Sequence, residues 1–198
     1  MQSRQVLVIA GPTGSGESTI TDELLRRYSG KIQRLITATT RSPRHGEEDG
    51  VNYYFFDKKT FFAKQQSGEI LESTYVSNRD TYYGSCKDDL EKKLVGGKIV
   101  IVNSDIVGAK FYKTHYNATT IFILPTHMEE LSGRLQRRNP EMSNEELRKR
   151  TEDAEREIHD DQSFYDYTVT NADGKLEASI DEVVSILVRE GYDIGVVT

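Results

Sequence analysis

The sequence predicts an α/β fold with a parallel sheet at its core. Three observations support this: short apolar, β-branched runs typical of strands covered on both faces, helical patterns between those runs, and a glycine-rich turn after the first run. The chain of 198 residues fits one domain that buries its own core. Strands that alternate with helices indicate parallel strands joined by right-handed crossovers.

Each element has a local pattern of its own. The strand pattern occurs at 6–10, 97–105, 119–125 and 165–171, and the helical pattern at 18–30, 86–97, 126–139 and 176–192. In the first helix, Ile20, Leu24 and Leu25 share one face. The third helix is expected to begin after Thr126 as its N-cap, because Glu129 follows three residues later.

Two segments interrupt this alternation. Residues 34–85 alternate in short runs rich in Tyr, Thr, Arg and Gly, as a small antiparallel insertion does, and residues 134–157 are dominated by charge. The charged segment is either a solvated helical hairpin or a lid over a ligand. We predict a core of 1–33, 94–126 and 158–198, an inserted subdomain at 34–93, and a lid segment at 127–157.

Composition excludes several classes of protein. No stretch is apolar enough to span a bilayer and no secretory leader is recognisable, so we expect a cytoplasmic protein. A single cysteine, Cys86, agrees with a reducing compartment. The net charge of −6 argues against nucleic acid as a partner. Arginines nevertheless cluster locally, which favours a small anionic ligand.

The turn "GPTGSGEST" has the spacing of a phosphate-binding P-loop, G-x-x-x-x-G-K-[ST]. Such a loop binds phosphate through backbone N–H groups and the positive end of the following helix. Its residues are Gly11, Pro12, Thr13, Gly14, Ser15, Gly16, Glu17, Ser18 and Thr19. Ser18 occupies the position whose hydroxyl ligates Mg²⁺.

Glu17 departs from this pattern because it stands at the lysine position. The lysine of a P-loop reaches the β and γ phosphates and stabilises charge during phosphoryl transfer. An acid removes that attraction and can add a repulsion. Two like unit charges about 4 Å apart repel by roughly 4 kcal/mol at an effective dielectric near 20. We therefore expect a large loss of rate unless another cation takes the lysine's place. An outward turn of Glu17 would remove the repulsion but would not restore the cation.

The stretch "TATTRSPRHGEEDGVNYYF" resembles the monophosphate-binding segment of guanylate kinases, and the resemblance covers nearly the whole chain in order. It implies a three-layer P-loop NTPase fold with an inserted monophosphate-binding subdomain and a helical lid. It also implies transfer of a phosphoryl group from ATP to GMP with Mg²⁺. The implied ligands of the GMP phosphate are Arg41, Arg44, Tyr53 and Tyr83, and those of guanine are Glu72, Thr37 and Ser85. Forked guanidinium donors and tyrosine hydroxyls suit a phosphate, and a carboxylate suits the paired N–H donors of guanine.

The resemblance also assigns the ATP side and the lid. Arg134, Arg138 and Arg150 match arginines that close over the ATP phosphates, and Asn171 matches a position near the adenine, although a turn-forming asparagine is an equally good explanation.

A second departure lies at Asn103, where the family usually has an acid on the strand beside the P-loop; Asp105 retains the other acid of the GMP site. We hypothesise that Asn103 compensates for Glu17, since two carboxylates there would repel.

Three functions stay open on the sequence. The first is a guanylate kinase, monomeric or homodimeric, of reduced activity. The second is a disabled kinase-like module that binds GMP or a phosphorylated peptide, and the third is a kinase of another small phosphate ester.

Overall fold

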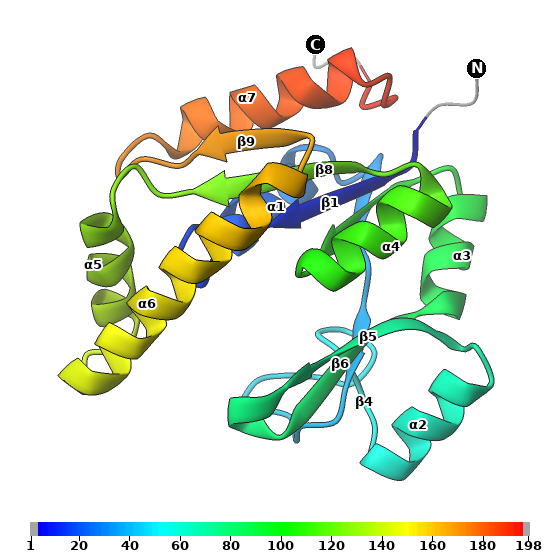
Figure 1. The fold of residues 1–198 in the computed structure, drawn as a ribbon. Coiled ribbons are helices and arrows are strands. Elements are labelled where there is room, and N and C mark those ends of the chain that lie inside the picture. The colour runs from blue at the N-terminus through cyan, green and yellow to red at the C-terminus, as the bar shows by residue number, and fades with distance from the viewer. Residues whose placement is uncertain (1–3, 196–198) are drawn as a thin grey trace.

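The computed structural model describes residues 4–195 and has two sheets (Figure 1). The larger sheet has the order β2-β7-β1-β8-β9, and all its strands are parallel. Its strands are β1 (Val6–Ala10), β2 (Ile32–Arg34), β7 (Ile99–Asn103), β8 (Thr119–Leu124) and β9 (Tyr167–Thr170). The predicted α/β fold with a parallel core sheet is confirmed.

Helices cover both faces of this sheet, which gives three layers. On one face, α1 (Glu17–Arg27) and α7 (Leu176–Arg189) enclose one buried cluster with the sheet. On the other face, α3 (Lys87–Val95) and α4 (Ile106–Tyr116) enclose the second cluster. The apolar β-branched runs of the strands are buried on both sides for this reason.

The smaller sheet has the order β4-β3-β6-β5 and lies below the core sheet in Figure 1. Its strands are β3 (Thr37–Thr39), β4 (Tyr54–Phe55), β5 (Ile70–Val76) and β6 (Thr81–Cys86). The helix α2 (Lys58–Gln66) packs on it through Phe61, and a short 3-10 turn (Ser77–Arg79) joins β5 to β6. The expected antiparallel insertion needs one correction, because β3 and β4 are parallel.

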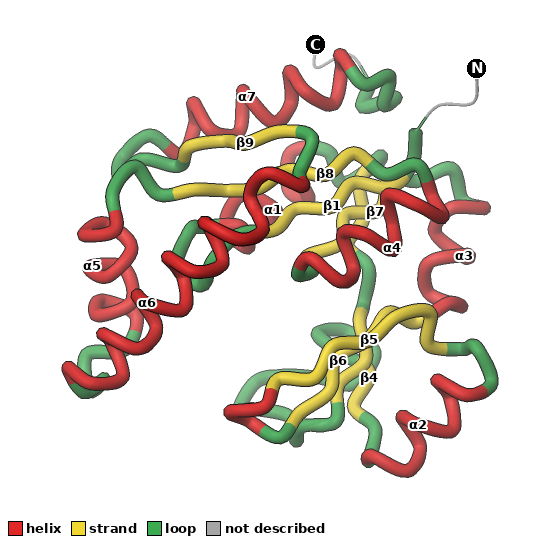
Figure 2. Tube along the Cα trace, in the orientation of Figure 1, coloured by secondary structure: helices red, strands yellow, loops and turns green. Residues whose placement is uncertain are grey.

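The charged segment forms two helices, α5 (Met128–Arg138) and α6 (Asn144–Asp161), which lie at one end of the core sheet (Figure 2). They pack on each other through Leu131, Leu135 and Ala154. The expected N-cap at Thr126 is wrong: α5 begins at Met128 after His127, whose side chain makes no capping bond. Glu130 instead accepts a hydrogen bond from the backbone N–H of Thr126.

The predicted division into core, subdomain and lid stays a prediction. Its boundary at residue 93 falls inside α3, whose Leu90 packs against the core sheet. Residues 1–3 and 196–198, assigned to the core, lie outside the described residues. Within residues 4–195 no helix has the length and apolar character that a bilayer crossing requires.

Candidate functional site

The glycine loop connects β1 to α1, and α1 begins at Glu17, one residue earlier than predicted. Ser18 and Thr19 are exposed on the first turn, and the backbone N–H of Ser15 donates to the carbonyl of Pro12 at 2.9 Å. Gly16 has a φ of +99°, and a Cβ there would lie 2.1 Å from Nδ2 of Asn171. Only glycine fits at this position.

Two side chains hold the loop from outside. The amide of Asn171 donates to the carbonyl oxygen of Ser15 at 2.8 Å, and Arg134 donates to the same oxygen at 3.0 Å. Arg134 also donates to the carbonyl of Asn171 at 2.7 Å and pairs with Asp173 at 2.7 Å. Both residues, predicted to contact ATP, therefore brace the backbone of the phosphate loop in this conformation.

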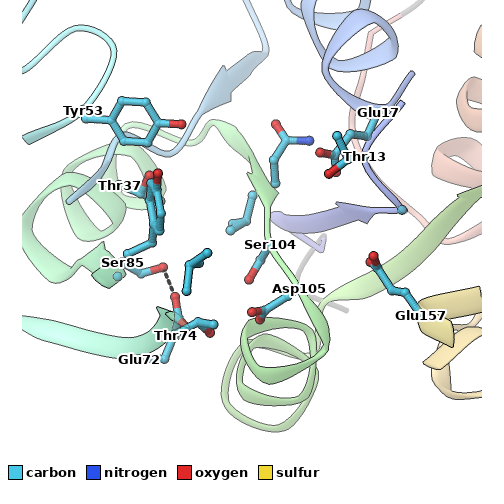
Figure 3. A pocket seen from close by; sticks show the side chains of 16 residues that line it. Thr13, Glu17, Thr37, Tyr53, Glu72, Thr74, Ser85, Ser104, Asp105 and Glu157 are labelled. Atoms are coloured by element: carbon cyan, nitrogen blue, oxygen red, sulfur yellow. Dashed lines mark hydrogen bonds between the residues drawn. The ribbon is translucent and has the colours of Figure 1, made fainter. Parts of the chain in front are cut away.

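Glu17 points into a central cavity of about 270 Å³ (Figure 3). Burial raises its pKa to about 8, and the nearby carboxyl of Glu157 raises it further. Burial also raises the pKa of Glu157 to about 7. A carboxyl with a pKa near 8 is mainly protonated at neutral pH, so Glu17 is a neutral group there rather than a fixed negative charge.

Asn103, at the end of β7, lines the same cavity. Its amide nitrogen donates to the carbonyl of Ile9 at 3.3 Å and to the hydroxyl of Thr21 at 3.0 Å. The carboxylate of Asp105 caps α4 by accepting from the backbone N–H groups of Val107 and Gly108. Asp105 thus has a structural role beside its place in the cavity wall.

The predicted guanine ligands converge on the small sheet. Thr37 of β3 stands opposite Ser85 of β6 in the antiparallel ladder, so both side chains lie on one face. The hydroxyl of Ser85 donates to the carboxyl of Glu72 on β5 (Figure 3). Burial raises the pKa of Glu72 to about 7, against the lowering effect of this hydrogen bond.

Two of the predicted phosphate ligands, Tyr53 and Tyr83, contact a third, Arg41. Its guanidinium lies 4.9 Å from the ring centre of Tyr53 and donates to the hydroxyl of Tyr83 at 3.3 Å. Glu47 accepts two hydrogen bonds from it, at 2.6 and 2.7 Å. Sequence reasoning gave Glu47 no role, although it lies within the matched motif. It orients Arg41 and balances its charge.

The central cavity joins these groups. The phosphate loop contributes Gly11, Thr13 and Glu17; the small sheet contributes Thr37, Tyr53, Glu72, Tyr83 and Ser85; the end of β7 adds Asn103 and Asp105. Glu157, which also lines it, was missed, because nothing in the sequence distinguishes it from the other acids of α6.

Arg44, Arg138 and Arg150 do not line the central cavity. They face a second cavity of about 290 Å³, which Thr13 of the phosphate loop also lines. Arg150 pairs with Glu146 at 2.7 Å on its own helix. The sequence-predicted residues are therefore not gathered in one cavity: some line the central cavity and others the second one, with Thr13 in both. Others line neither, among them Ser18, Arg41, Arg134 and Asn171.

The comparisons with known proteins agree with this geometry. The family model described as guanylate kinase matches residues 3–190. The chain belongs to the guanylate kinase family. A guanylate kinase from Wolbachia sp. subsp. Brugia malayi is 37% identical over 187 residues, which cover 93% of this chain and 92% of that protein. One from Porphyromonas gingivalis is 38% identical over 156 residues, which cover 78% of this chain and 82% of that protein.

One solved structure of the same family and one more distant structure resemble this chain. The crystal structure of guanylate kinase from Anaplasma phagocytophilum matches with a TM-score of 0.72 and 29% identity, covering 96% of this chain and 87% of that one. The SH3-kinase fragment of tight junction protein 3 matches with a TM-score of 0.56 and 10% identity, covering 97% of this chain and 60% of that fragment. The second likeness shows the fold alone.

Proposed function

We propose that this member of the guanylate kinase family transfers the γ-phosphoryl group of ATP to GMP and forms ADP and GDP. One observation carries the proposal: a single cavity has the phosphate loop on one wall and Glu72, Ser85 and Tyr83 on the other. A donor phosphate on the loop and an acceptor phosphate beside Tyr83 would then face each other across that cavity.

Glu72 supports guanine as the base. Its ionised carboxylate accepts from the two adjacent N–H donors of guanine, whereas adenine presents no such pair. The hydroxyl of Ser85 already bonds the carboxyl and holds its position. The same residues count against a different small phosphate ester, which would leave the buried Glu72 carboxyl with the hydroxyl of Ser85 but without the two donors of guanine.

The reaction forms a bond between the γ-phosphorus of ATP and an oxygen of the GMP phosphate. The bond from that phosphorus to the β–γ bridging oxygen breaks, and its electron pair leaves with ADP. No covalent enzyme intermediate is involved, so positioning and charge stabilisation make up the catalysis. Arg41, held by Glu47 and Tyr83, would bind the acceptor phosphate.

The residues at the loop are compatible with Mg²⁺. Within residues 4–195 no group of three or more His, Cys, Asp or Glu side chains is placed to hold a metal ion. Mg²⁺ at nucleotide sites is bound by few protein ligands, with phosphates and water supplying the rest. Ser18, exposed on the first turn of α1, would provide the protein ligand. The chemistry that Mg²⁺ would supply at this position is neutralisation of negative charge on the phosphate oxygens.

Glu17 sets the expected rate. A protonated carboxyl does not repel the phosphates, but it does not supply the cation of a P-loop lysine either. We therefore propose that phosphoryl transfer is slower than in an enzyme with the P-loop lysine. Glu17 also keeps a second function in view, a kinase-like module that binds GMP or a phosphorylated peptide without phosphoryl transfer.

Calorimetry and product analysis separate these functions. GMP should bind at least about a hundredfold more tightly than AMP, because adenine does not offer Glu72 the two adjacent N–H donors of guanine. GDP and ADP should appear in equal amounts when ATP and Mg²⁺ are added. GMP binding without products would favour the binding module, and equal affinity for AMP would contradict guanine recognition.

A further inference from the structure

The second cavity has an unusual balance of charge. Four arginines line it, Arg44, Arg79, Arg138 and Arg150, and no carboxylate does. The central cavity is the opposite, since four carboxyl groups and no basic side chain line it. Thr13 of the phosphate loop lines both. We call the second one the arginine cavity.

Three of these arginines are accounted for by the resemblance to guanylate kinases, and Arg79 is not. It comes from the turn between β5 and β6, which in Figure 1 points to the side where α5 and α6 lie. Arg79, Arg150 and Thr13 also line a neighbouring cavity of about 300 Å³, to which Lys149 and the acids Glu146, Asp153 and Glu157 contribute as well. Arg79 is therefore close to both the lid helices and the phosphate loop.

The acid of the turn does not pair with Arg79. The acid next in sequence, Asp80, has a φ of +47° and accepts hydrogen bonds from Lys58 at 2.6 Å and from Tyr75 at 3.0 Å. Its carboxylate is thus held by groups outside the arginine cavity. No carboxylate between residues 4 and 195 forms an ion pair with the Arg79 guanidinium. The backbone is fixed by the hydroxyl of Thr81, which donates to the Arg79 carbonyl at 2.8 Å.

Within residues 4–195, Arg150 pairs with Glu146, whereas Arg44, Arg79 and Arg138 form no ion pair. Three unpaired guanidinium groups around one cavity, in a protein of net charge −6, point to a polyanionic ligand. A guanidinium is always charged and binds phosphate oxygens through a fork of donors, so it can replace a lysine as a source of positive charge. We propose that Arg79 binds the phosphate groups of ATP and supplies the positive charge that the loop lacks at Glu17. This inference rests on the proposed phosphotransfer and adds a phosphate-binding residue from the β5–β6 turn.

The first test compares Arg79→Gln and Arg79→Lys with the wild type. For Arg79→Gln we expect kcat to fall about a hundredfold or more and the Kd for ATP to rise about tenfold, with the Kd for GMP unchanged within threefold. Arg79→Lys keeps the charge and should retain part of the rate. Arg148→Gln is the matched control, because Arg148 is exposed on α6 and pairs with Glu152. It should stay within about threefold of wild type. Equal rates for Arg79→Gln and Arg148→Gln would overturn the proposal.

The second test places Arg79→Gln in a Glu17→Lys background. If Arg79 substitutes for the missing lysine, Glu17→Lys should reduce the kcat loss caused by Arg79→Gln to about tenfold or less. An equal loss of kcat in both backgrounds would contradict the inference that Arg79 takes the place of the lysine. If the wild type gives no products at all, the proposed function fails. Calorimetry with ATP still tests whether Arg79 binds the phosphates: a Kd about tenfold weaker in Arg79→Gln supports this, and an unchanged Kd refutes it.

Discussion

The amide of Asn103 donates to the hydroxyl of Thr21 at 3.0 Å and to the carbonyl of Ile9 at 3.3 Å. These contacts connect the end of β7 to α1 and β1 directly beneath the phosphate loop. An aspartate at this position cannot donate to either oxygen. The residue that replaces the usual family acid is therefore part of the packing of the loop, in addition to any electrostatic compensation of Glu17.

Asn103→Asp should destabilise the protein by about 1–3 kcal/mol at pH 8. Two effects add: the lost donor beneath the loop and a new charge in a cavity that Glu17 and Glu157 also line. Denaturant unfolding measures the change. Asn103→Ala is the control, because it removes the same hydrogen bonds without adding charge. Adding Glu17→Lys should recover stability in Asn103→Asp but not in Asn103→Ala. If Glu17→Lys changes the stability of both variants equally, Asn103 does not compensate for Glu17.

Glu17→Gln should stabilise the protein increasingly as the pH rises. The pKa of Glu17 is raised from 4.5 to about 8. The folded state then holds a proton that the unfolded state loses between these values, so stability falls as pH rises through that window. Glutamine cannot ionise and escapes this loss, which amounts to roughly 2–4 kcal/mol at pH 8.

Thermal unfolding of the wild type and Glu17→Gln at pH 5 and at pH 8 measures this difference. The two melting temperatures should lie close together at pH 5 and separate at pH 8, with the variant higher. A gap that is the same at both pH values would show that Glu17 does not titrate in this range.

GMP binding should weaken as the pH falls below about 7. Burial raises the pKa of Glu72 to about 7, and only the ionised carboxylate accepts both guanine donors. Each further unit by which the pH falls lowers the ionised fraction of Glu72 about tenfold. The Kd for GMP should therefore rise by up to about tenfold per unit. Calorimetry between pH 5.5 and 8 measures it. In Glu72→Gln, which binds more weakly at every pH, the dependence should flatten to that of the GMP phosphate alone.

Arg134→Lys should weaken ATP binding and leave GMP binding unchanged. Arg134 donates to the carbonyls of Ser15 and Asn171, and a lysine cannot make both contacts with the same geometry. We expect the KM for ATP to rise about tenfold. Arg137→Lys is the control, since Arg137 is exposed and its one ion pair within residues 4–195 is with Asp173. A matching rise in the control would show that the contacts to the loop are unimportant.

Sequence reasoning was successful where a residue's function is local. The loop glycines and the strand runs are specified by neighbours along the chain, and the fold follows from them. It failed at contacts between distant segments. The bond from Asn103 to Thr21 spans 82 residues, and the support of Ser15 by Asn171 spans 156. Glu157 and Arg79 carry no local signal, and only the folded chain places them beside the loop.

The most direct measurement is formation of GDP and ADP from GMP, ATP and Mg²⁺ by the wild type, with Glu17→Lys and Glu17→Lys/Asn103→Asp beside it. We predict equal amounts of both products from the wild type, above an enzyme-free background, at a lower rate than from the double variant. Product formation by the variants alone, while the wild type still binds GMP, would contradict the enzymatic function and identify a binding protein.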